Sequence, residues 1–209
     1  GLHENKFGVD IESAKRMYVH AKNAAALDPV GIHFHIGSQI TELQPFKDAA
    51  LVLANLLRNL KALKIDIKFF DVGGGIGIRY EDEETISLYE YAQGIFSALS
   101  GLDITFVCEP GRYLVGNCGS FLTKVLYEKH NGYKRFVIVD GAMNDLIRPS
   151  LYGAYHEIEA YGKETSNASV CDVVGPVCES GDFFAKNIVL PSLEHDDLLV
   201  VKSAGAYGF

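Results

Sequence analysis

The feature that most constrains the fold is an alternation of helix-like and strand-like segments over the first half of the chain. Apolar residues recur at helical spacing from Ile11 to about Leu27, and Asp10 is placed to cap this helix. Strand-like and helical runs then alternate: "VGIHFHIGS", "FKDAALVLANLLRNLKALK", "IKFFDVGGGIG", "ISLYEYAQGIFSALS" and "LDITFVCEPGRY". This order predicts an α/β fold with a parallel sheet.

The pattern changes after Arg112. Strand-like runs separated by turn residues continue almost to the end of the chain, with little helical periodicity: "GSFLTKVLYEKH", "YKRFVIVDG", "AYHEIEAY", "ASVCDVVG" and "DDLLVVKSAG". We therefore predict two domains. Residues 1–114 belong to a β/α domain, and residues 115–209 form a mostly β domain of barrel or sandwich type.

Composition excludes several classes of partner. The formal net charge is −8 and no basic run is present, so the electropositive face that nucleic acid requires is missing. No apolar stretch approaches the ~18 residues of a membrane span. The opening "GLHENKFGVD" lacks the apolar core of a signal peptide. We expect a cytoplasmic protein that binds neither nucleic acid nor membrane.

The four cysteines are expected to be free thiols. They include no C-x-x-C pair and no histidines at zinc-ligand spacing, which argues against a metal site. A chain of this length with a cytosolic composition does not need disulfides to fold.

Three loops follow the three predicted parallel strands, and we expect them to meet at one edge of the sheet, where ligands bind in such folds. They are "HIGSQ", "GGGIG" and "EPGR". The run Gly73–Gly75 leaves the backbone bare, so its N–H groups could converge on an anion such as phosphate. A tight turn between strand and helix explains the same run, and the glycines alone do not decide between the two.

Charged and polar residues flank this edge. Glu109 and Arg112 lie on either side of a Pro-Gly turn and either point to the same edge or pair with each other on the surface. His33 and His35 share one face of a strand, since they are two residues apart. No nearby carboxylate in the sequence completes a metal-binding set, so we expect no metal and a structural role for His33. Ser38 follows in the loop and could donate to a phosphate.

Six motifs together resemble the pyridoxal-phosphate-dependent decarboxylases of fold type III. They occur in that family's order: "HIGSQ", "DVGGGIG", "EPGRYLV", "DGAMNDLIRPSLY", "GPVCESGD" and "GAYG". The pair "CESGD" and "RPSLY" is closer to the diaminopimelate branch than to the ornithine or arginine branch. The resemblance implies the C-terminal part of a (β/α)8 TIM-type barrel followed by a β domain. It also implies decarboxylation of meso-2,6-diaminopimelate to L-lysine and CO₂.

The resemblance assigns the cofactor, pyridoxal 5'-phosphate, to residues of the three loops. In it His35 stacks on the pyridine ring, and Glu109 faces the ring nitrogen and keeps it protonated, which makes the ring an electron sink. The remaining cofactor-binding positions hold the phosphate or line the ring: Ser38, Gly73, Gly74, Gly75, Pro110, Gly111, Arg112 and Tyr207.

The substrate positions follow from the same resemblance. Diaminopimelate has two amino-acid ends, so a selective enzyme must bind the distal carboxylate and ammonium while it reacts at the other end. The matching positions are Arg112, Arg148, Tyr152, Glu179 and Tyr207. Cys178 matches the general acid that protonates the carbon left by CO₂. The alternative is that Cys178 only fills a turn. In the family the "CESGD" loop reaches the neighbouring subunit's site, so the resemblance also implies a homodimer whose active sites are shared between subunits.

The sequence departs from the family pattern at its beginning. The family's cofactor lysine lies in a "Y-A-x-K-A-N" setting that this sequence lacks, and Lys6 does not match it. We therefore expect a fragment of a longer protein, inactive alone. Two alternatives stay open: a related decarboxylase acting on another amino acid, and a non-catalytic relative that binds or regulates a partner.

Overall fold

The computed structural model describes residues 6–209 and divides into two compact units. The first unit contains the described residues up to Gly77 and the segment Glu84–Gly111. The second contains Ile78–Glu83 and Arg112–Phe209. A short piece of the earlier sequence, which includes Tyr80, therefore belongs with the C-terminal half.

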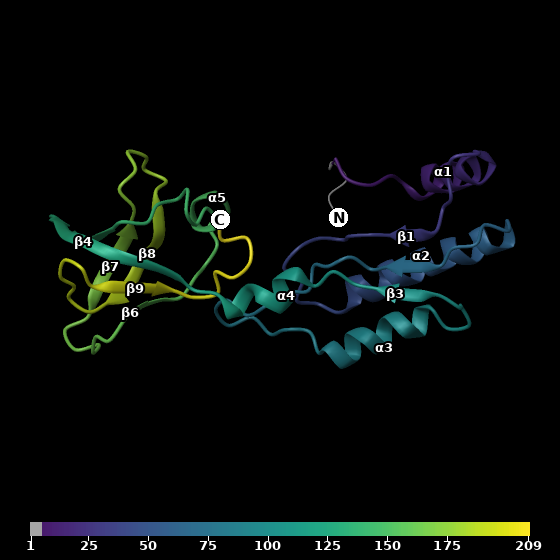
Figure 1. The fold of residues 1–209 in the computed structure, drawn as a ribbon. Helices are drawn as coiled ribbons and strands as arrows, with labels where there is room; N and C mark the ends of the chain where they lie inside the picture. Colours follow the sequence, from purple (N-terminus) through teal and green to yellow (C-terminus); the bar gives the residue numbers. More distant parts are fainter. Residues whose placement is uncertain (1–5) are drawn as a thin grey trace. The chain divides into compact units, whose positions relative to one another are not determined.

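The first unit is a parallel β/α arrangement, as the sequence predicts (Figure 1). Its elements are α1 (Ile11–Asn23), β1 (Gly31–His33), α2 (Gln44–Ala62), β2 (Phe69–Asp71), α3 (Leu88–Ala98) and β3 (Thr105–Val107). The strands pair in parallel in the order β1-β2-β3, and His33, Asp71 and Val107 lie opposite one another in the register.

Helix α1 begins where predicted and ends earlier. The Asp10 side chain accepts a hydrogen bond from the Ser13 N–H at 2.8 Å, which is the expected N-cap. The helix ends at Asn23, and Ala24 has extended backbone angles, so the prediction of helix to about Leu27 is too long. None of the residues of α1 is fully buried.

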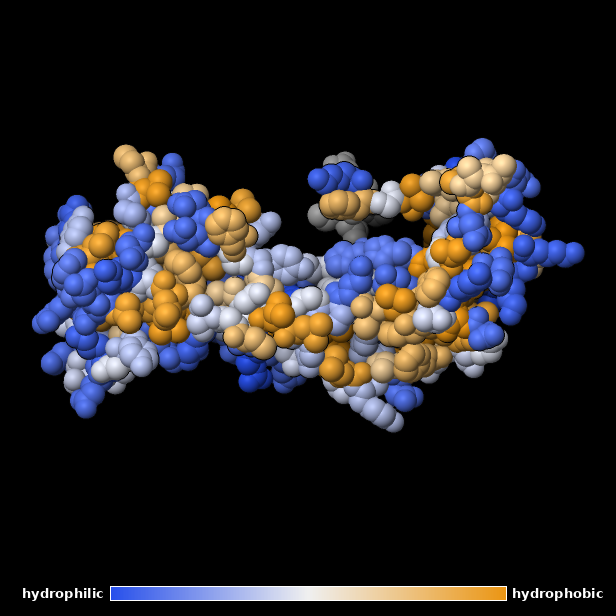
Figure 2. Space-filling model, in the orientation of Figure 1, coloured by the Kyte–Doolittle hydropathy of each residue, from blue (hydrophilic) through white to orange (hydrophobic). Residues whose placement is uncertain are grey.

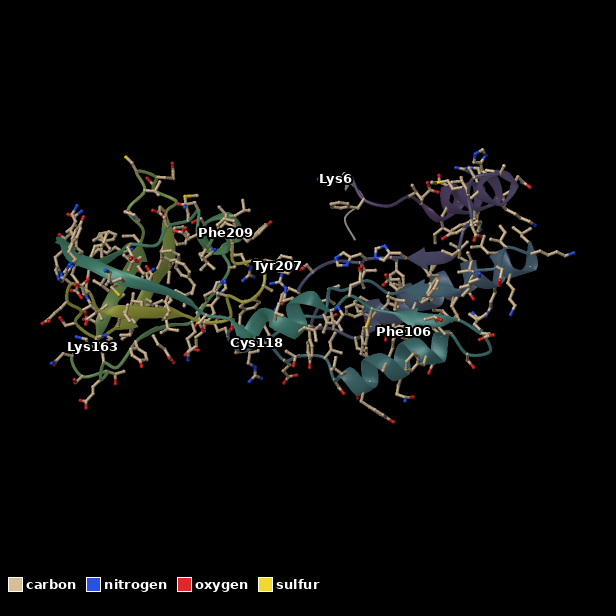
Figure 3. All side chains as sticks on the ribbon, in the orientation of Figure 1. Lys6, Phe106, Cys118, Lys163, Tyr207 and Phe209 are labelled. Atoms are coloured by element: carbon tan, nitrogen blue, oxygen red, sulfur yellow. The ribbon has the colours of Figure 1, made fainter. Side chains whose placement is uncertain are left out.

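Helices α2 and α3 pack against each other and supply about half of the buried apolar residues of the first unit. Phe46 of α2 meets Tyr91 of α3 edge to face, with ring centroids 5.1 Å apart. Phe96 of α3 and Phe106 of β3 form a second such pair at 5.3 Å, and Figure 3 labels Phe106 on its strand. These contacts fix α3 against the sheet.

The second unit is mostly β. It begins with the short helix α4 (Gly111–Val115), whose first residue is the last of the first unit, and a 3-10 turn, η1 (Gly116–Cys118). The strands are β4 (Phe121–Asn131), β5 (Lys134–Val139), β6 (Ile158–Ala160), β7 (Ser169–Val174), β8 (Phe183–Leu190) and β9 (Leu198–Val201). They form one sheet in the order β6-β9-β4-β5-β7-β8. The end strands β6 and β8 contact each other, so the sheet is nearly closed around an apolar core.

Three features of this region differ from the sequence-based expectation. Arg112 lies on α4 and not in a loop. Helix α5 (Arg148–Tyr152) was not predicted, because five residues are too few to show a helical period. It is delimited instead by Pro149 in its first turn and by Gly153 in the left-handed conformation, φ 61°. Strand β8 was also not among the predicted strands.

The free cysteines and the exposed apolar residues are both ordinary for a chain of this composition. All four cysteines are free, as predicted. Figure 2 shows hydrophobic residues over α3, where Leu88 and Phe96 are exposed. Among the residues that the structure describes, no helix combines the length and the apolar character needed to cross a bilayer.

Candidate active site

The carboxyl edge of the parallel sheet gathers ionisable residues from all three strands. His33 ends β1, Asp71 ends β2, and Glu109 follows β3 by two residues. His33 Nε2 lies 3.1 Å from Glu109 Oε2, and both side chains are about half exposed. Potential ligand atoms of His33, Asp71 and Glu109 lie within 4.8 Å of one another.

The expectation that no carboxylate lies near His33 is therefore wrong. Parallel pairing places Asp71 directly opposite His33 and brings Glu109, 76 residues away in sequence, within hydrogen-bonding distance. The three side chains could hold a cation, but His33 and Glu109 already satisfy each other, and exposed acidic groups are common without a metal. His33 thus pairs with the Glu109 carboxylate, a contact that the sequence did not suggest.

The glycine run is required by close packing of three loops. A Cβ at Gly73 would lie 2.4 Å from the Phe34 carbonyl oxygen, one at Gly74 2.2 Å from the Glu109 oxygen, and one at Gly75 2.4 Å from the Gly37 oxygen. Gly73 and Gly75 also have positive φ. Close packing in a tight turn therefore explains the three glycines, independently of any ligand.

The N–H groups of the run do not all point to the same place. Gly73 N–H donates to Asp71 Oδ1 at 2.9 Å, and Gly74 N–H lies 3.4 Å from His35 Nδ1. Gly75 N–H has no acceptor within the part of the chain that the structure describes. His35 and Ser38 are exposed in the loop after β1. An anion at this edge would accordingly be met by Gly75, with Ser38 in the neighbouring loop.

A second cluster, in the second unit, combines arginine and aromatic side chains. Arg112 Nη1 donates to the Tyr80 hydroxyl, and its guanidinium carbon lies 4.6 Å from the centre of the Tyr207 ring. Tyr207 has φ 57°, an uncommon conformation for a residue other than glycine, and Figure 3 labels it on the C-terminal segment. Backbone contacts fix that segment, since Gly205 N–H donates to the Gly116 carbonyl at 3.0 Å.

Arg148 completes this arginine and tyrosine cluster. Arg148 as a whole is only 8% exposed, and its guanidinium carbon lies 4.4 Å from the centre of the Tyr80 ring. Nη1 lies 2.7 Å from His156 Nε2. No carboxylate forms an ion pair with Arg148 among residues 6–209. Burial lowers the pKa of Arg148 from its ordinary value.

The "GPVCESGD" segment is an ordered loop between β7 and β8. Asp182 is 4% exposed, and its carboxylate accepts from Val177 N–H at 2.8 Å and from Met143 N–H at 2.7 Å. Glu179 Oε1 accepts from Gly181 N–H at 3.1 Å. Cys178 and Glu179 are exposed, so the buried aspartate presents both of them to the outside of the unit.

The predicted site residues thus fall into separate groups. His35, Ser38, Gly73, Gly74, Gly75, Glu109, Pro110 and Gly111 belong to the first unit, and Arg112, Arg148, Tyr152, Cys178, Glu179 and Tyr207 to the second. Within the second unit, Arg112 and Arg148 both lie against the Tyr80 ring, and Tyr207 packs on Arg112. Tyr152 is 73% exposed at the end of α5.

Sequence analysis missed four residues of these clusters: Asp71, Tyr80, His156 and Asp182. Tyr80 lies in a segment between predicted elements. It has a role only because this segment, Ile78–Glu83, belongs to the second unit. His156 and Asp182 are buried polar groups, and nothing in a single sequence marks a histidine or an aspartate as buried.

Comparison with known proteins decides the family. The family model for "Pyridoxal-dependent decarboxylase, C-terminal sheet domain" matches residues 17–205, which is most of the chain. The chain belongs to the pyridoxal-dependent decarboxylase family. The prediction made from the six motifs is confirmed at this level.

Relatives in this decarboxylase family refine the comparison. A diaminopimelate decarboxylase of Campylobacter jejuni is 60% identical over 210 residues, covering 100% of this chain and 52% of the relative. The crystal structure of diaminopimelate decarboxylase from Helicobacter pylori complexed with L-lysine matches with a TM-score of 0.94 and 56% identity, again over 100% of this chain and 52% of the other. The diaminopimelate decarboxylase from M. jannaschii in co-complex with L-lysine matches with a TM-score of 0.92 and 34% identity, over 99% and 49%. The chain spans about half the length of these relatives.

Substitution of Gly74 by alanine tests the packing of the three loops. We expect Gly74→Ala to lower the free energy of unfolding by about 2 kcal/mol or more, because its Cβ would meet a backbone oxygen, which cannot rotate away. Gly111→Ala is the matched control, since no atom lies within 4 Å of a Cβ there. Urea unfolding of both variants gives the comparison. Equal stabilities would contradict the packing argument.

The pH dependence of stability tests the state of His156. Burial lowers the pKa of His156, and the charges of Arg148 and Arg112 lower it further against the opposing hydrogen bond to Lys202. The unfolded chain therefore binds a proton at this histidine at higher pH than the folded unit does. Stability contributed by neutral His156 is present above about pH 6.5 and is lost as the pH falls below that value, by at most about 1.4 kcal/mol per pH unit. We expect urea unfolding of His156→Gln to show a shallower loss between pH 7.5 and 5.5. The same slope in both proteins would contradict this assignment.

Proposed function

We propose that the chain is part of a decarboxylase that converts meso-diaminopimelate to L-lysine and CO₂ with pyridoxal 5'-phosphate. Diaminopimelate decarboxylases that are 42–60% identical over the whole chain support the reaction. The environment of Arg148 is the observation that favours a substrate with a second carboxylate. This guanidinium is nearly buried, is held by an aromatic ring and a histidine, and has no carboxylate partner among the described residues.

We propose that the first unit is part of a (β/α)8 barrel. Each of the edge strands β1 and β3 pairs with a neighbour on one side only, within the part of the chain described. A cavity of about 1050 Å³ lies between α1, β1 and α2, and its lining is mostly apolar, with Met17, Ile32 and Leu56, beside polar residues such as Arg16 and His20. Further barrel strands would pair with these edges and fill the apolar space beneath α1, which buries no residue of its own.

The residues at the carboxyl edge of the sheet fit the cofactor. Pyridoxal phosphate supplies an electron sink when its ring nitrogen is protonated. A carboxylate is needed beside that nitrogen, and Glu109 offers one that His33 holds in place. His35 is exposed in the adjacent loop and is free to lie against the ring. For the phosphate, Gly75 offers an unused N–H and Ser38 an exposed hydroxyl, whereas Gly73 and Gly74 serve mainly to let the loops approach.

The substrate's distal end would be held by the second unit. The planar guanidinium of Arg148 suits a carboxylate, and its low exposure strengthens the attraction by excluding water. Tyr152 follows on the same short helix, and the Tyr207 ring packs against Arg112. Glu179 offers a negative charge for the distal ammonium. With Glu179 supplied by the loop of a second copy, in the shared-site dimer proposed below, the set binds both charges of one amino-acid end.

We propose that Cys178 returns a proton to the carbon that has lost CO₂. A thiol S–H is a proton donor and can act as a general acid. The loop that carries Cys178 is exposed, and its backbone is fixed by Asp182. Both properties suit a loop that reaches the active site of a second copy, so we propose a homodimer with shared sites, located in the cytoplasm.

Two alternatives differ in a measurable way. A related decarboxylase acting on another amino acid would keep the cofactor residues and would have no need of Arg148. A non-catalytic relative would bind no cofactor. The joint presence of Glu109, Cys178 and Glu179 favours catalysis, because a binding protein has no physical reason to present all three.

Measurement of CO₂ release tests the proposal. The complete reading frame, expressed with pyridoxal phosphate, is expected to release CO₂ from meso-diaminopimelate and not from L-lysine, L-ornithine or L-arginine. Cys178→Ala should lower kcat by about 100-fold or more, because a general acid contributes at least that factor. Cys118→Ala, at another exposed thiol, is the matched control and should keep full activity.

Each other outcome has a definite meaning. Release from one of the other amino acids would replace the proposed substrate and leave the cofactor site standing. No release from any of them, with no cofactor bound, would support the non-catalytic relative. Full activity in Cys178→Ala would remove the thiol from the mechanism.

A further inference from the structure

His156 is the most completely buried polar residue in contact with Arg148, which we propose binds the distal carboxylate of the substrate. It is 2% exposed, and its ring meets the Tyr80 ring edge to face at 5.4 Å. Both ring nitrogens have partners: Nδ1 lies 2.8 Å from the Lys202 carbonyl oxygen, and Nε2 lies 2.7 Å from Arg148 Nη1. The imidazole therefore connects the backbone after β9 to the guanidinium.

These partners determine where the proton lies on His156. A carbonyl oxygen can only accept, so Nδ1 must carry hydrogen and donate to Lys202. A guanidinium can only donate, so Nε2 must be the bare acceptor. Both bonds form only when the imidazole is neutral with its proton on Nδ1. Burial and the neighbouring Arg148 and Arg112 charges favour the same neutral form by lowering the pKa of His156.

A neutral acceptor has a specific advantage at this position. A buried guanidinium needs hydrogen-bond acceptors to offset its desolvation, and a carboxylate is its usual partner. A carboxylate would, however, cancel the charge that attracts an anionic ligand. Imidazole satisfies one N–H of Arg148 and leaves the positive charge uncompensated. The Tyr80 ring, 4.4 Å from the guanidinium carbon, adds a contact that is also without net charge.

We propose that His156 is a positioning residue that holds Arg148 in place for the distal carboxylate without neutralising it. This inference rests on the proposed function, because it takes the ligand of Arg148 to be the carboxylate of an amino-acid end. His156 itself touches no substrate. It acts by fixing the direction of the guanidinium and by preserving its charge.

A pair of ligands isolates this role. L-lysine and 1,5-diaminopentane have the same carbon chain and the same two amines, and only L-lysine carries a carboxylate. Their dissociation constants are to be measured by calorimetry on the holoenzyme from the complete reading frame. In His156→Leu, which removes both hydrogen bonds, we expect L-lysine to bind about 10- to 100-fold more weakly, the range for a lost hydrogen bond to a charged group. The affinity for 1,5-diaminopentane should change less than about twofold.

His156→Gln is the matched control. Its amide can donate to the Lys202 carbonyl and accept from Arg148 without adding charge, so we expect most of the L-lysine affinity to return. A purely structural role for His156 would weaken both ligands alike in His156→Leu, and that result would overturn the proposal. So would an unchanged affinity for L-lysine in a folded His156→Leu holoenzyme.

A third variant decides the matter if His156→Leu does not fold. His156→Glu keeps an acceptor beside Arg148 but adds the negative charge that the proposal says must be absent. We expect it to weaken L-lysine at least tenfold relative to His156→Gln and to leave 1,5-diaminopentane bound as before. Equal L-lysine affinities in the two variants would overturn the proposal. Failure of the proposed function would instead show in the unsubstituted holoenzyme, as no preference for L-lysine over 1,5-diaminopentane.

Discussion

The in-register parallel pairing of β1, β2 and β3 is the constraint on which the candidate cofactor edge depends. This pairing places His33 opposite Asp71. The segment after β3, which carries Glu109, then lies beside both residues. Three loops must then pack backbone against backbone, and only glycine fits where the carbonyl oxygens of Phe34, Glu109 and Gly37 approach. The bare glycine run, the His33 and Glu109 pair and the exposed His35 are consequences of one sheet register. Because the strands contain only three residues each, most of this edge is loop, and its shape depends on those glycine contacts.

The second unit holds the positively charged guanidinium of Arg148 in a nearly buried position from which it can still bind an anion. Arg148 lies on a helix of five residues that the remaining structure must hold in place, and Ser150 of the same helix donates to the Gly181 carbonyl in the Cys178 loop. Its guanidinium is supported by an aromatic ring and a neutral imidazole, neither of which cancels its charge. Within residues 6–209 no carboxylate pairs with Arg148, and a carboxylate is the kind of group that an amino-acid substrate provides. The same helix therefore connects the proposed carboxylate grip to the loop of the proposed general acid.

Local sequence signals predicted much of the fold and only part of the site. The amphipathic helices, the Asp10 cap and the parallel β/α order follow from periodicity and capping, and they are confirmed. The five-residue helix α5 was missed because it is shorter than two turns, so its boundaries come from Pro149 and Gly153 and not from a hydrophobic period. Long-range contacts were beyond reach: Glu109 lies 76 residues from His33, and the Lys202 carbonyl lies 46 residues from His156. The roles assigned to Cys178, Arg148 and Glu109 came from the resemblance to a family, because spacing alone left a surface ion pair or a simple turn equally open.

The central claim is that Arg148 selects a substrate with a second carboxylate, and its most direct test is the kcat/KM of the holoenzyme for meso-diaminopimelate with and without this side chain. In Arg148→Ala the account predicts a fall of about 100-fold or more, since a charged hydrogen bond and its ion pair are both lost. The absorbance of the bound cofactor should stay unchanged, because Arg148 is assigned to the distal end of the substrate. A kcat/KM within about twofold of the unsubstituted enzyme would contradict the account and would favour a substrate that has no distal carboxylate.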